Sequence, residues 1–211
     1  LRGKRVLITG GPTWVAIDDV RVISNISTGE MSLLLARRAA SLGMKVDLLL
    51  GPAMSTVVLP ARVRVSRFKF YHELSALLSQ KLRACRYDVI LHAAAVSDYL
   101  CRTKQGKMSS ASLIRTLHLT RAPKLIRKIK RLNPDALLVI FKLETGLMDT
   151  ALVRRGLLAL KDTGSDFVVA NTIHQGRYRA LILDEARRVL CAASKNAVSV
   201  QLLTKIKESL S

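Results

Sequence analysis

The chain has 211 residues, of which 49% are hydrophobic, so it is long enough to bury the core of one domain without disulfides. It carries 35 Lys and Arg against 15 Asp and Glu, which gives a formal net charge of +20 at pH 7. A basic surface attracts nucleic acid without a dedicated site, but only 4% of the residues are aromatic and no basic stripe is interleaved with them. We therefore expect a generally basic surface, and nucleic acid is not the expected partner.

Three further features concern the cellular compartment and the origin of the chain. Cys85, Cys101 and Cys191 are odd in number and form no Cys-x-x-Cys pair, which argues against a disulfide scaffold or a zinc site and fits a reducing cytoplasm. No apolar run approaches the ~20 residues that a membrane span needs, and the start lacks the apolar region of a signal peptide. Leu1 is not a native initiator, so we expect that the chain was trimmed or excised from a longer one.

Apolar runs and amphipathic segments alternate along the chain. Runs typical of buried strands alternate with stretches that carry leucine or alanine at helical spacing. This repeated βαβ rhythm predicts an α/β fold with a doubly wound, Rossmann-like parallel sheet and helices on both faces, in a single domain of residues 1–211. The predicted strands are residues 5–9, 45–49, 62–68, 88–95, 136–141 and 166–170, and the predicted helices are residues 29–42, 71–85, 147–161 and 196–211.

Two segments depart from this rhythm. Residues 180–184 and 188–192 flank a short polar turn, which predicts a hairpin at the edge of the sheet. Residues 99–124 form a polar stretch rich in Lys and Ser. Long polar connections of this kind often carry function, so we expect a mobile flap over the site or an arm between subunits.

Two turns rich in small and polar residues dominate the first 30 positions. The apolar run at residues 6–8 leads into Gly10 and Gly11, as a buried strand leads into a phosphate-accommodating turn. A second turn comes just before a predicted helix, whose first N–H groups point outward unpaired and attract anions. Together the turns indicate a nucleotide with an acidic ligand beside it. The residues that stand out in the second turn are Arg21, Asn25, Ser27 and Gly29.

These blocks resemble the phosphopantothenoylcysteine synthetase (phosphopantothenate–cysteine ligase) family of DNA/pantothenate metabolism flavoproteins. Members carry a Gly-Gly-Thr or Gly-Pro-Thr turn, then Asp-x-Val-Arg, then Asn-x-Ser-Ser/Thr-Gly, and all three blocks occur here in order. The resemblance extends from Lys4 to about Asp184, because the residues that follow four of the predicted strands also match. It implies a ligase of coenzyme A biosynthesis that joins 4′-phosphopantothenate and L-cysteine through an acyl-nucleotidylate. CTP or ATP is consumed with Mg²⁺, and pyrophosphate is released.

The resemblance also implies partners. Members are homodimers with shared active sites, act on small molecules in the cytoplasm and need no membrane. In bifunctional relatives a segment similar to residues 1–5 opens the synthetase half after a flavin-dependent decarboxylase half. A fused or separate decarboxylase is therefore an expected partner.

The functional residues of the family carry over by position. Asn25 matches a residue that meets the pantothenate carboxyl end and supports the attack of cysteine, and Lys107 matches a flap lysine that neutralises the nucleotide phosphates, with Lys104 as a close alternative. These two roles are the catalytic ones, and Mg²⁺ is held mainly by phosphates and water, with no protein metal site implied. The residues implied to contact the nucleotide are Gly10, Gly11, Ser27, Gly29, Asp98, Lys107, Phe141 and Asn171. Those implied to bind phosphopantothenate are Arg21, which reaches across the dimer interface, Asn25, Ala94, Ala95 and Asp98.

Several departures from the family pattern bear on activity. Ser32 stands where members usually have a glycine, which puts one phosphate contact in doubt, although the serine hydroxyl can substitute for it. Glu30 replaces the usual basic residue, and Lys161 is the one candidate for the two helix lysines of many bacterial relatives. Residues 141–145 are closer to the eukaryotic form, which uses ATP, so the choice between CTP and ATP stays open.

Three alternatives to the ligase remain. Thr9-Gly10-Gly11 resembles the opening of NAD(P)-dependent reductases, but the Gly-x-Gly-x-x-Gly spacing fails and no acidic residue ends the second predicted strand. The charge of +20 motivates a basic nucleic-acid-binding module. The departures at Glu30 and Ser32 motivate an inactive paralogue. The four histidines show no metal spacing, and His92 is expected to be a satisfied, buried histidine.

Overall fold

The computed structural model describes residues 1–109, 114 and 116–210. The strands of its main sheet are β1 (Arg5–Gly10), β4 (Lys45–Leu50), β5 (Arg64–Arg67), β6 (Val89–His92), β9 (Leu137–Thr145), β10 (Phe167–His174), β11 (Arg177–Asp184) and β12 (Val189–Ala192). Their order across the sheet is β12-β11-β10-β9-β6-β1-β4-β5. All pairs from β10 to β5 are parallel, whereas β11 is antiparallel to both of its neighbours.

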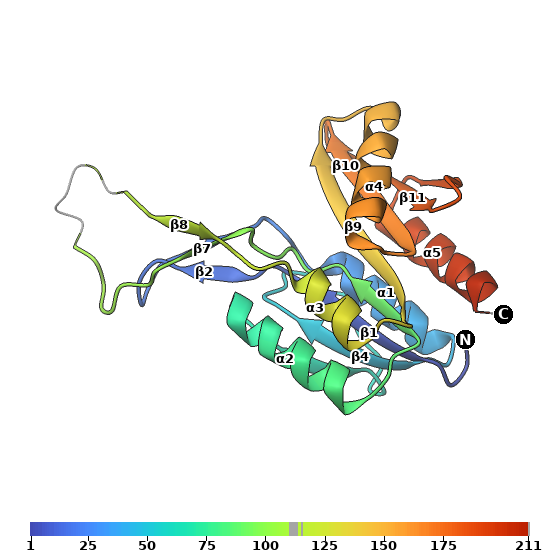
Figure 1. Ribbon diagram of the computed structural model, residues 1–211, viewed down its shortest axis with the longest axis horizontal. Coiled ribbons are helices and arrows are strands. Elements are labelled where there is room, and N and C mark those ends of the chain that lie inside the picture. The colour runs from blue at the N-terminus through green and yellow to red at the C-terminus, as the bar shows by residue number, and fades with distance from the viewer. Residues whose placement is uncertain (110–113, 115, 211) are drawn as a thin grey trace.

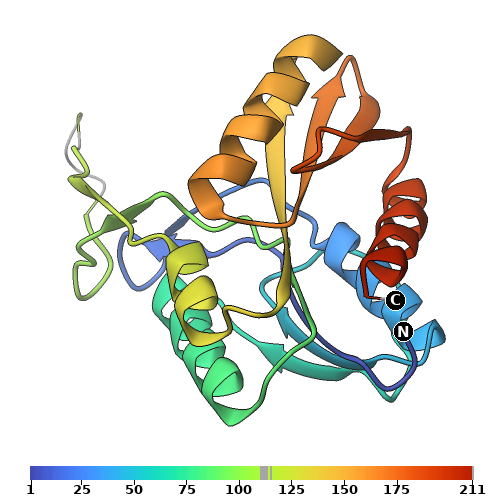
Figure 2. The ribbon, with the colours of Figure 1, turned by 45° about the vertical axis from the view of Figure 1, so that its right-hand side comes forward.

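Helices cover both faces of this sheet (Figures 1 and 2). The helices are α1 (Glu30–Ser41), α2 (Tyr71–Ala84), α3 (Leu125–Leu132), α4 (Asp149–Thr163) and α5 (Lys195–Ser209). One apolar cluster joins the sheet to α1 and α5, with Leu35 and Leu202 fully buried in it. A second cluster joins the opposite face to α2, α3 and α4, around Leu74, Ile129 and Leu152. The sheet is therefore buried on both sides, as parallel sheets require.

Two short antiparallel ribbons follow the carboxyl ends of β1 and β6 and form an arm, which we define as residues 14–24 and 99–121. The first ribbon pairs β2 (Trp14–Ala16) with β3 (Val22–Ser24), and the second pairs β7 (Tyr99–Cys101) with β8 (Leu119–Arg121). The arm extends well away from the helices and the main sheet (Figure 1). The expected flap of residues 99–124 thus contains a ribbon, and its positions 110–113 and 115 lie outside the described residues.

The doubly wound parallel sheet with helices on both faces is confirmed, and so is the edge hairpin. Three strand predictions were wrong by three or more residues at the carboxyl end, because β6 ends at His92 and not at Ala95, whereas β9 and β10 each continue four residues beyond the predicted ends at 141 and 170. The sequence also did not predict α3 or the ribbons of the arm. Helix α3 buries only Leu125 and Ile129 among its residues, and so short an apolar stripe gives a weak periodic signal.

Candidate functional site

The carboxyl edge of the sheet, where β1, β4 and β6 end, is tied together by backbone hydrogen bonds. The Gly51 N–H donates to the Gly10 carbonyl oxygen over 2.9 Å, and the Ala95 N–H donates to the Gly11 carbonyl oxygen over 2.9 Å. The Thr13 N–H then donates to the Ala95 carbonyl oxygen over 3.2 Å. Three chain segments far apart in sequence thus meet at one rigid edge. This is where doubly wound sheets bind their ligands.

Helix α1 begins against this edge. Its N-cap is Gly29, with φ of +72°, and the Glu30 N–H of the first turn donates to Thr28 Oγ1 over 3.4 Å. A Cβ on Gly29 would come within 2.9 Å of the Ala53 Cβ and 3.6 Å of the Gly11 Cα, so the two glycine turns are in close contact. The first turn of α1 and the positive end of the helix dipole therefore lie beside the Gly11 turn, as an anion site requires.

Asn25 is held at the same edge by a hydrogen bond. Its side-chain Nδ2 donates to the Ala95 carbonyl oxygen over 3.1 Å, and the side chain is otherwise exposed. Ala94 is anchored in turn by its N–H, which donates to Thr9 Oγ1 over 3.3 Å. The structure thus brings together most of the residues predicted for this end of the site. They are Gly10, Gly11, Asn25, Gly29, Ala94 and Ala95, and Ser27 lies between Asn25 and Gly29 in the chain.

Ser32 does not offer its hydroxyl to the surface. The residue is 1% exposed, and its Oγ donates to the Gly29 carbonyl oxygen over 2.7 Å. A Cβ placed on Gly10 would lie 1.8 Å from this Oγ, so the hydroxyl fills the space above the Gly10 backbone. The expectation that the hydroxyl replaces a phosphate contact is therefore wrong, because it is already committed inside the turn.

Phe141 and Asn171 lie on the face of the sheet that α1 covers. Thr9 and Ile140 are both register partners of His92, so Gly10 and Phe141 stand at the same level beyond the end of β6. Phe141 pairs with Val169 and packs on the α1 cluster, and Asn171 follows two residues later on the same face. The sequence had placed both residues at the ends of their strands. Both instead belong to the extension of β9 and β10 past β6.

The start of α1 also carries a charge pair. Glu30 Oε2 accepts from Lys195 Nζ over 2.6 Å, which neutralises the carboxylate at the helix N-terminus. Tyr178 lies nearby on β11, and its hydroxyl is buried with no hydrogen-bond partner among the described residues. Burial, and then the charge of Glu30, raises the pKa of Tyr178, so the phenol stays neutral. No local sequence pattern marks Tyr178, because its environment depends on Glu30, which is far away in the chain.

His92 ends β6 beneath the glycine turn. Its Nδ1 is 2.8 Å from Thr9 Oγ1, in a hydrogen bond between neighbouring strands. Burial of the ring lowers the pKa of His92 to about 4, so the imidazole is neutral at pH 7. The expectation of a satisfied histidine is confirmed, and the ring supports the edge by fixing Thr9.

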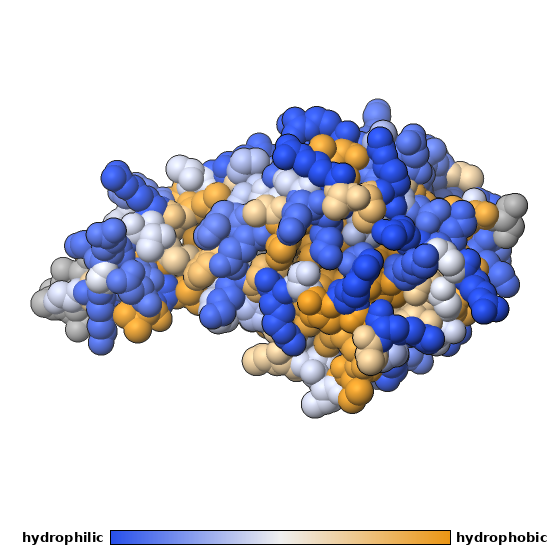
Figure 3. All heavy atoms as spheres, turned by 90° about the horizontal axis from the view of Figure 1, so that it is seen from below, coloured by the Kyte–Doolittle hydropathy of each residue, from blue (hydrophilic) through white to orange (hydrophobic). Residues whose placement is uncertain are grey.

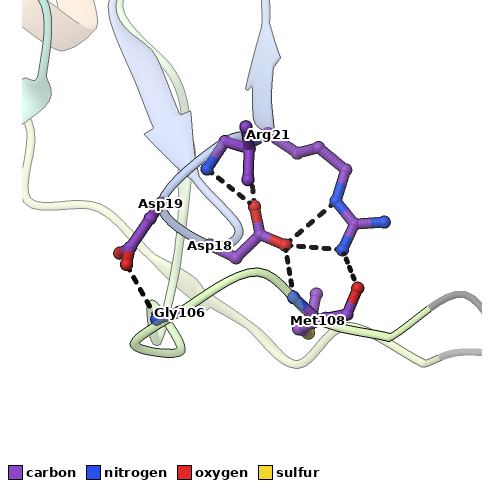
Figure 4. A network of polar contacts seen from close by, with 6 residues as sticks. Asp18, Asp19, Arg21, Gly106 and Met108 are labelled. Atoms are coloured by element: carbon purple, nitrogen blue, oxygen red, sulfur yellow. Dashed lines mark hydrogen bonds and ion pairs between the residues drawn. The ribbon is translucent and has the colours of Figure 1, made fainter.

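Arg21 lies in the arm and is fixed by Asp18 (Figure 4). Its Nη2 is 2.5 Å from Asp18 Oδ2 and also donates to the Met108 carbonyl oxygen over 2.9 Å. Asp18 is 3% exposed, and its Oδ2 accepts the Met108 N–H over 3.0 Å. The hydrogen bond from Arg21 lowers the pKa of Asp18 well below its usual range. One carboxylate therefore joins the two halves of the arm.

Lys107 stands between two anchored residues of the arm. The Gly106 N–H donates to Asp19 Oδ2 over 2.8 Å, and the Met108 N–H is held by Asp18. The Lys107 side chain is exposed. The structure thus brings Lys107 next to the Arg21 turn and not to the glycine turns of its own sheet. Its assigned role stays a prediction.

Asp98 lies where the arm leaves the sheet. Its carboxylate pairs with Lys124 Nζ at 2.5 Å, and its backbone oxygen accepts the Ala122 N–H over 2.8 Å. The side chain is 66% exposed, so the pair is open to solvent and to a ligand. Asp98 therefore sits between the glycine turns and the outer arm, and its predicted contacts stay untested.

The described part of the chain gathers no group of three or more His, Cys, Asp and Glu that could hold a metal ion. Glu30 at the start of α1 and Asp98 at the base of the arm are each paired with a lysine. A Mg²⁺ ion bound at the carboxyl edge would need phosphate oxygens and water as its main ligands. No described helix is long and apolar enough to cross a membrane.

A doubly wound parallel sheet with a glycine turn and a helix N-terminus at its carboxyl edge defines the class of Rossmann-like α/β proteins. Within that class, the chain belongs to the family of the DNA/pantothenate metabolism flavoprotein C-terminal domain, whose model matches residues 1–210. It is 35% identical over 173 residues to the coenzyme A biosynthesis bifunctional protein CoaBC of Thermococcus kodakarensis, which covers 82% of this chain and 42% of the relative. The chain spans about half the length of the curated relatives it matches.

Solved structures show the same fold. The DNA/pantothenate metabolism flavoprotein from Streptococcus pneumoniae superposes with a TM-score of 0.88 at 24% identity, covering 98% of this chain and 100% of that one. A Cab2 H337A variant in complex with phosphopantothenate-cysteine gives a TM-score of 0.79 at 19% identity, covering 98% of this chain and 87% of that one. The overlap extends over almost the whole chain.

Proposed function

We propose that this chain is a phosphopantothenate–cysteine ligase of coenzyme A biosynthesis. The observation that carries the proposal is the meeting of Asn25, Ala95 and the two glycine turns at the start of α1, in a member of this family. Its relatives support the same proposal, since they are coenzyme A biosynthesis bifunctional proteins. The substrates are 4′-phosphopantothenate, L-cysteine and either CTP or ATP.

The reaction has two displacements. The pantothenate carboxylate attacks the α-phosphorus of the nucleotide, and pyrophosphate leaves. The cysteine amine then attacks the acyl carbon and displaces the nucleoside monophosphate. Neither step needs a protein nucleophile, so positioning and charge stabilisation supply the acceleration.

The carboxyl edge provides groups for both steps. The N–H groups at the start of α1 and the backbone around Gly10, Gly11, Ser27 and Gly29 bind nucleotide phosphates, to which Mg²⁺ adds positive charge. Asn25 remains accessible beside Ala95, where its amide orients the acyl group. Asp98 takes hydroxyl or amide donors of either substrate. Phe141 and Asn171 bind the rest of the nucleotide, because they lie on the same face as Gly10.

We further propose that two copies of the chain share their active sites through the arm. Strands β3 and β8 are exposed along their whole length, and Val20, Ile23 and Leu119 are 64%, 39% and 47% exposed. Apolar atoms are visible among hydrophilic ones on the arm, at the left of Figure 3. A second chain that covers this surface places Arg21 and Lys107 against the substrate phosphates and carboxylate of its partner.

We also propose that a flavin-dependent decarboxylase, fused or separate, consumes the product and that both enzymes act in the cytoplasm; the bifunctional nature of the relatives supports a second enzyme that works beside this one. The burial of Ser32 and the pairing of Glu30 favour the inactive paralogue as the second candidate, because the edge then offers one phosphate contact fewer than expected.

The test is pyrophosphate release by the purified chain with 4′-phosphopantothenate, L-cysteine and Mg²⁺, run in parallel with CTP and with ATP. We expect release that depends on phosphopantothenate and on one of the two nucleotides. Binding of all substrates without release identifies the inactive paralogue. Absence of substrate binding together with steeply salt-dependent RNA binding supports a basic nucleic-acid module instead.

A further inference from the structure

A basic hollow lies at the opposite end of the sheet from the candidate active site. We call it the amino-edge hollow, and its volume is about 480 Å³. Strand β1 runs from Arg5 in this hollow to Gly10 at the carboxyl edge, a separation of about 17 Å at the usual rise per residue. The hollow is therefore distinct from the nucleotide site. It is lined by Arg5, Gly43, Met44, Lys45, Val46, Arg62 and Arg64.

The parallel register of the strands brings these cations together. Arg5 and Lys45 are register partners at the starts of β1 and β4, and Arg64 starts β5 beside them. The aliphatic part of the Arg2 side chain also lies here, since its Cγ is 3.2 Å from the position that a Cβ on Gly43 would take. Arg62 lies just before β5 and is exposed. The starts of three neighbouring parallel strands thus concentrate positive charge on the amino edge of the sheet.

The carboxylates of the neighbouring strands are already committed. Asp47 is buried and accepts from Arg64 Nη2 at 2.8 Å and from Lys81 Nζ at 2.9 Å. Asp88 accepts from Lys4 Nζ at 3.1 Å and from the Arg5 N–H at 2.7 Å. No acidic side chain is among the lining residues. Mutual repulsion of the remaining cations disfavours the folded chain, and a bound anion relieves it.

We propose that the amino-edge hollow is a second anion site, for a small molecule that carries two or more linked phosphates. Guanidinium groups bind phosphate oxygens in pairs, and the Arg64 group is already oriented by Asp47. The volume suits a nucleotide-sized ligand, and the lining has no aromatic side chain on which the bases of a nucleic acid could stack. The inference does not depend on the ligase reaction.

The test compares two double variants of the whole chain that remove equal charge. K45Q/R62Q removes two cations of the hollow that make no ion pair with Asp47, and R154Q/R155Q removes two exposed cations of α4. Calorimetric titration with inorganic pyrophosphate, at constant ionic strength and without Mg²⁺, measures the number of sites and their affinity. We expect R154Q/R155Q to bind pyrophosphate in the hollow, and K45Q/R62Q to bind it there at least tenfold more weakly.

Any pyrophosphate bound at the carboxyl edge is common to both variants, so the difference between them reports on the hollow alone. Urea unfolding without ligand is expected to show K45Q/R62Q to be at least as stable as R154Q/R155Q. Equal stoichiometry and affinity in the two variants would overturn the proposal in favour of bulk charge. A selective loss of RNA binding in K45Q/R62Q, with pyrophosphate binding unchanged, would overturn it in favour of a nucleic-acid surface.

Discussion

The carboxyl edge of the sheet and the arm contribute to the proposed site in different ways. At the edge, backbone hydrogen bonds and glycine contacts join β1, β4 and α1, and Gly10, Gly11 and Gly29 are buried. In the arm, β3 and β8 are exposed, and the carboxylates of Asp18 and Asp19 join the two ribbons. The edge is thus built by the fold itself. The arm depends on a few charged contacts and, in our proposal, on a second chain.

The largest expected effect is at Asn25. N25D replaces the amide donor beside the Ala95 carbonyl oxygen with a carboxylate that repels both this oxygen and the substrate carboxylate. We expect a loss of turnover of about 100-fold or more, the size found when one oriented donor is removed from an active site. The assay is pyrophosphate release. N196D, the same change at an exposed position of α5, is expected to leave turnover unchanged, and equal losses in both variants would remove Asn25 from the site.

A second prediction contrasts glycines of the two regions. Gly29 and Gly106 have nearly equal φ values of +72° and +73°, but a Cβ on Gly29 meets Ala53 at 2.9 Å, whereas one on Gly106 meets nothing within 4 Å. G29A is therefore expected to lower the free energy of unfolding by about 2–3 kcal/mol, and G106A by about 1 kcal/mol from backbone strain alone. Urea unfolding measures both. Equal losses would show that the edge is no more tightly packed than the arm.

A third prediction isolates the charge that holds the arm. D18N keeps the shape of the side chain but turns a carboxylate acceptor into a neutral one, which weakens its bonds from Arg21 and Met108. Hydrogen exchange of the amides of Val20, Arg21 and Met108 is expected to accelerate about tenfold. Exchange of the Leu7 amide in β1 serves as the control and is expected to stay unchanged. Acceleration in β1 as well would mean that the arm and the sheet open together.

A fourth prediction concerns the pH dependence that His92 gives to the sheet. The pKa of His92 is about 4 in the folded chain, against 6.5 as the reference value for the unfolded chain. Between pH 4 and pH 6.5 the unfolded chain therefore binds a proton that the folded chain does not bind. The contribution of His92 to the free energy of unfolding is therefore fully present above pH 6.5. It is lost as the pH drops toward 4, by on the order of 2 kcal/mol. Urea unfolding across this range should show the fall in the native chain, whereas H92N lacks the contribution. The same pH dependence of the free energy of unfolding in both chains would contradict the assignment of this fall to His92.

The sequence was sufficient to predict the architecture where apolar periodicity is strong. The strands and helices around Leu35, Leu48 and Leu74 are buried over enough residues to show their period, so the doubly wound sheet was predictable. Helix α3 and the ribbons were not, because they bury few apolar side chains. Their local patterns resemble those of polar loops.

Part of the site was predictable for another reason. The blocks around Gly11, Asn25 and Ala95 are contiguous motifs, and motifs can be found without knowing the fold. The bonds of Asp18 to Met108 and the filling of Gly10 by Ser32 depend on residues brought together only by folding. The sequence therefore indicated the candidate residues of the proposed site, but not that Lys107 and Arg21 stand together in the arm, away from the glycine turns.

The most direct test of the account is complementation between two inactive variants in the pyrophosphate-release assay. If Asn25 acts at the edge of one chain and Arg21 comes from the arm of its partner, N25D and R21A are each inactive as homodimers. A heterodimer then has one site with both changes and one native site, so an equal, fully exchanged mixture regains about a quarter of native activity. A mixture no more active than its components would contradict the shared site and place both residues in the same chain.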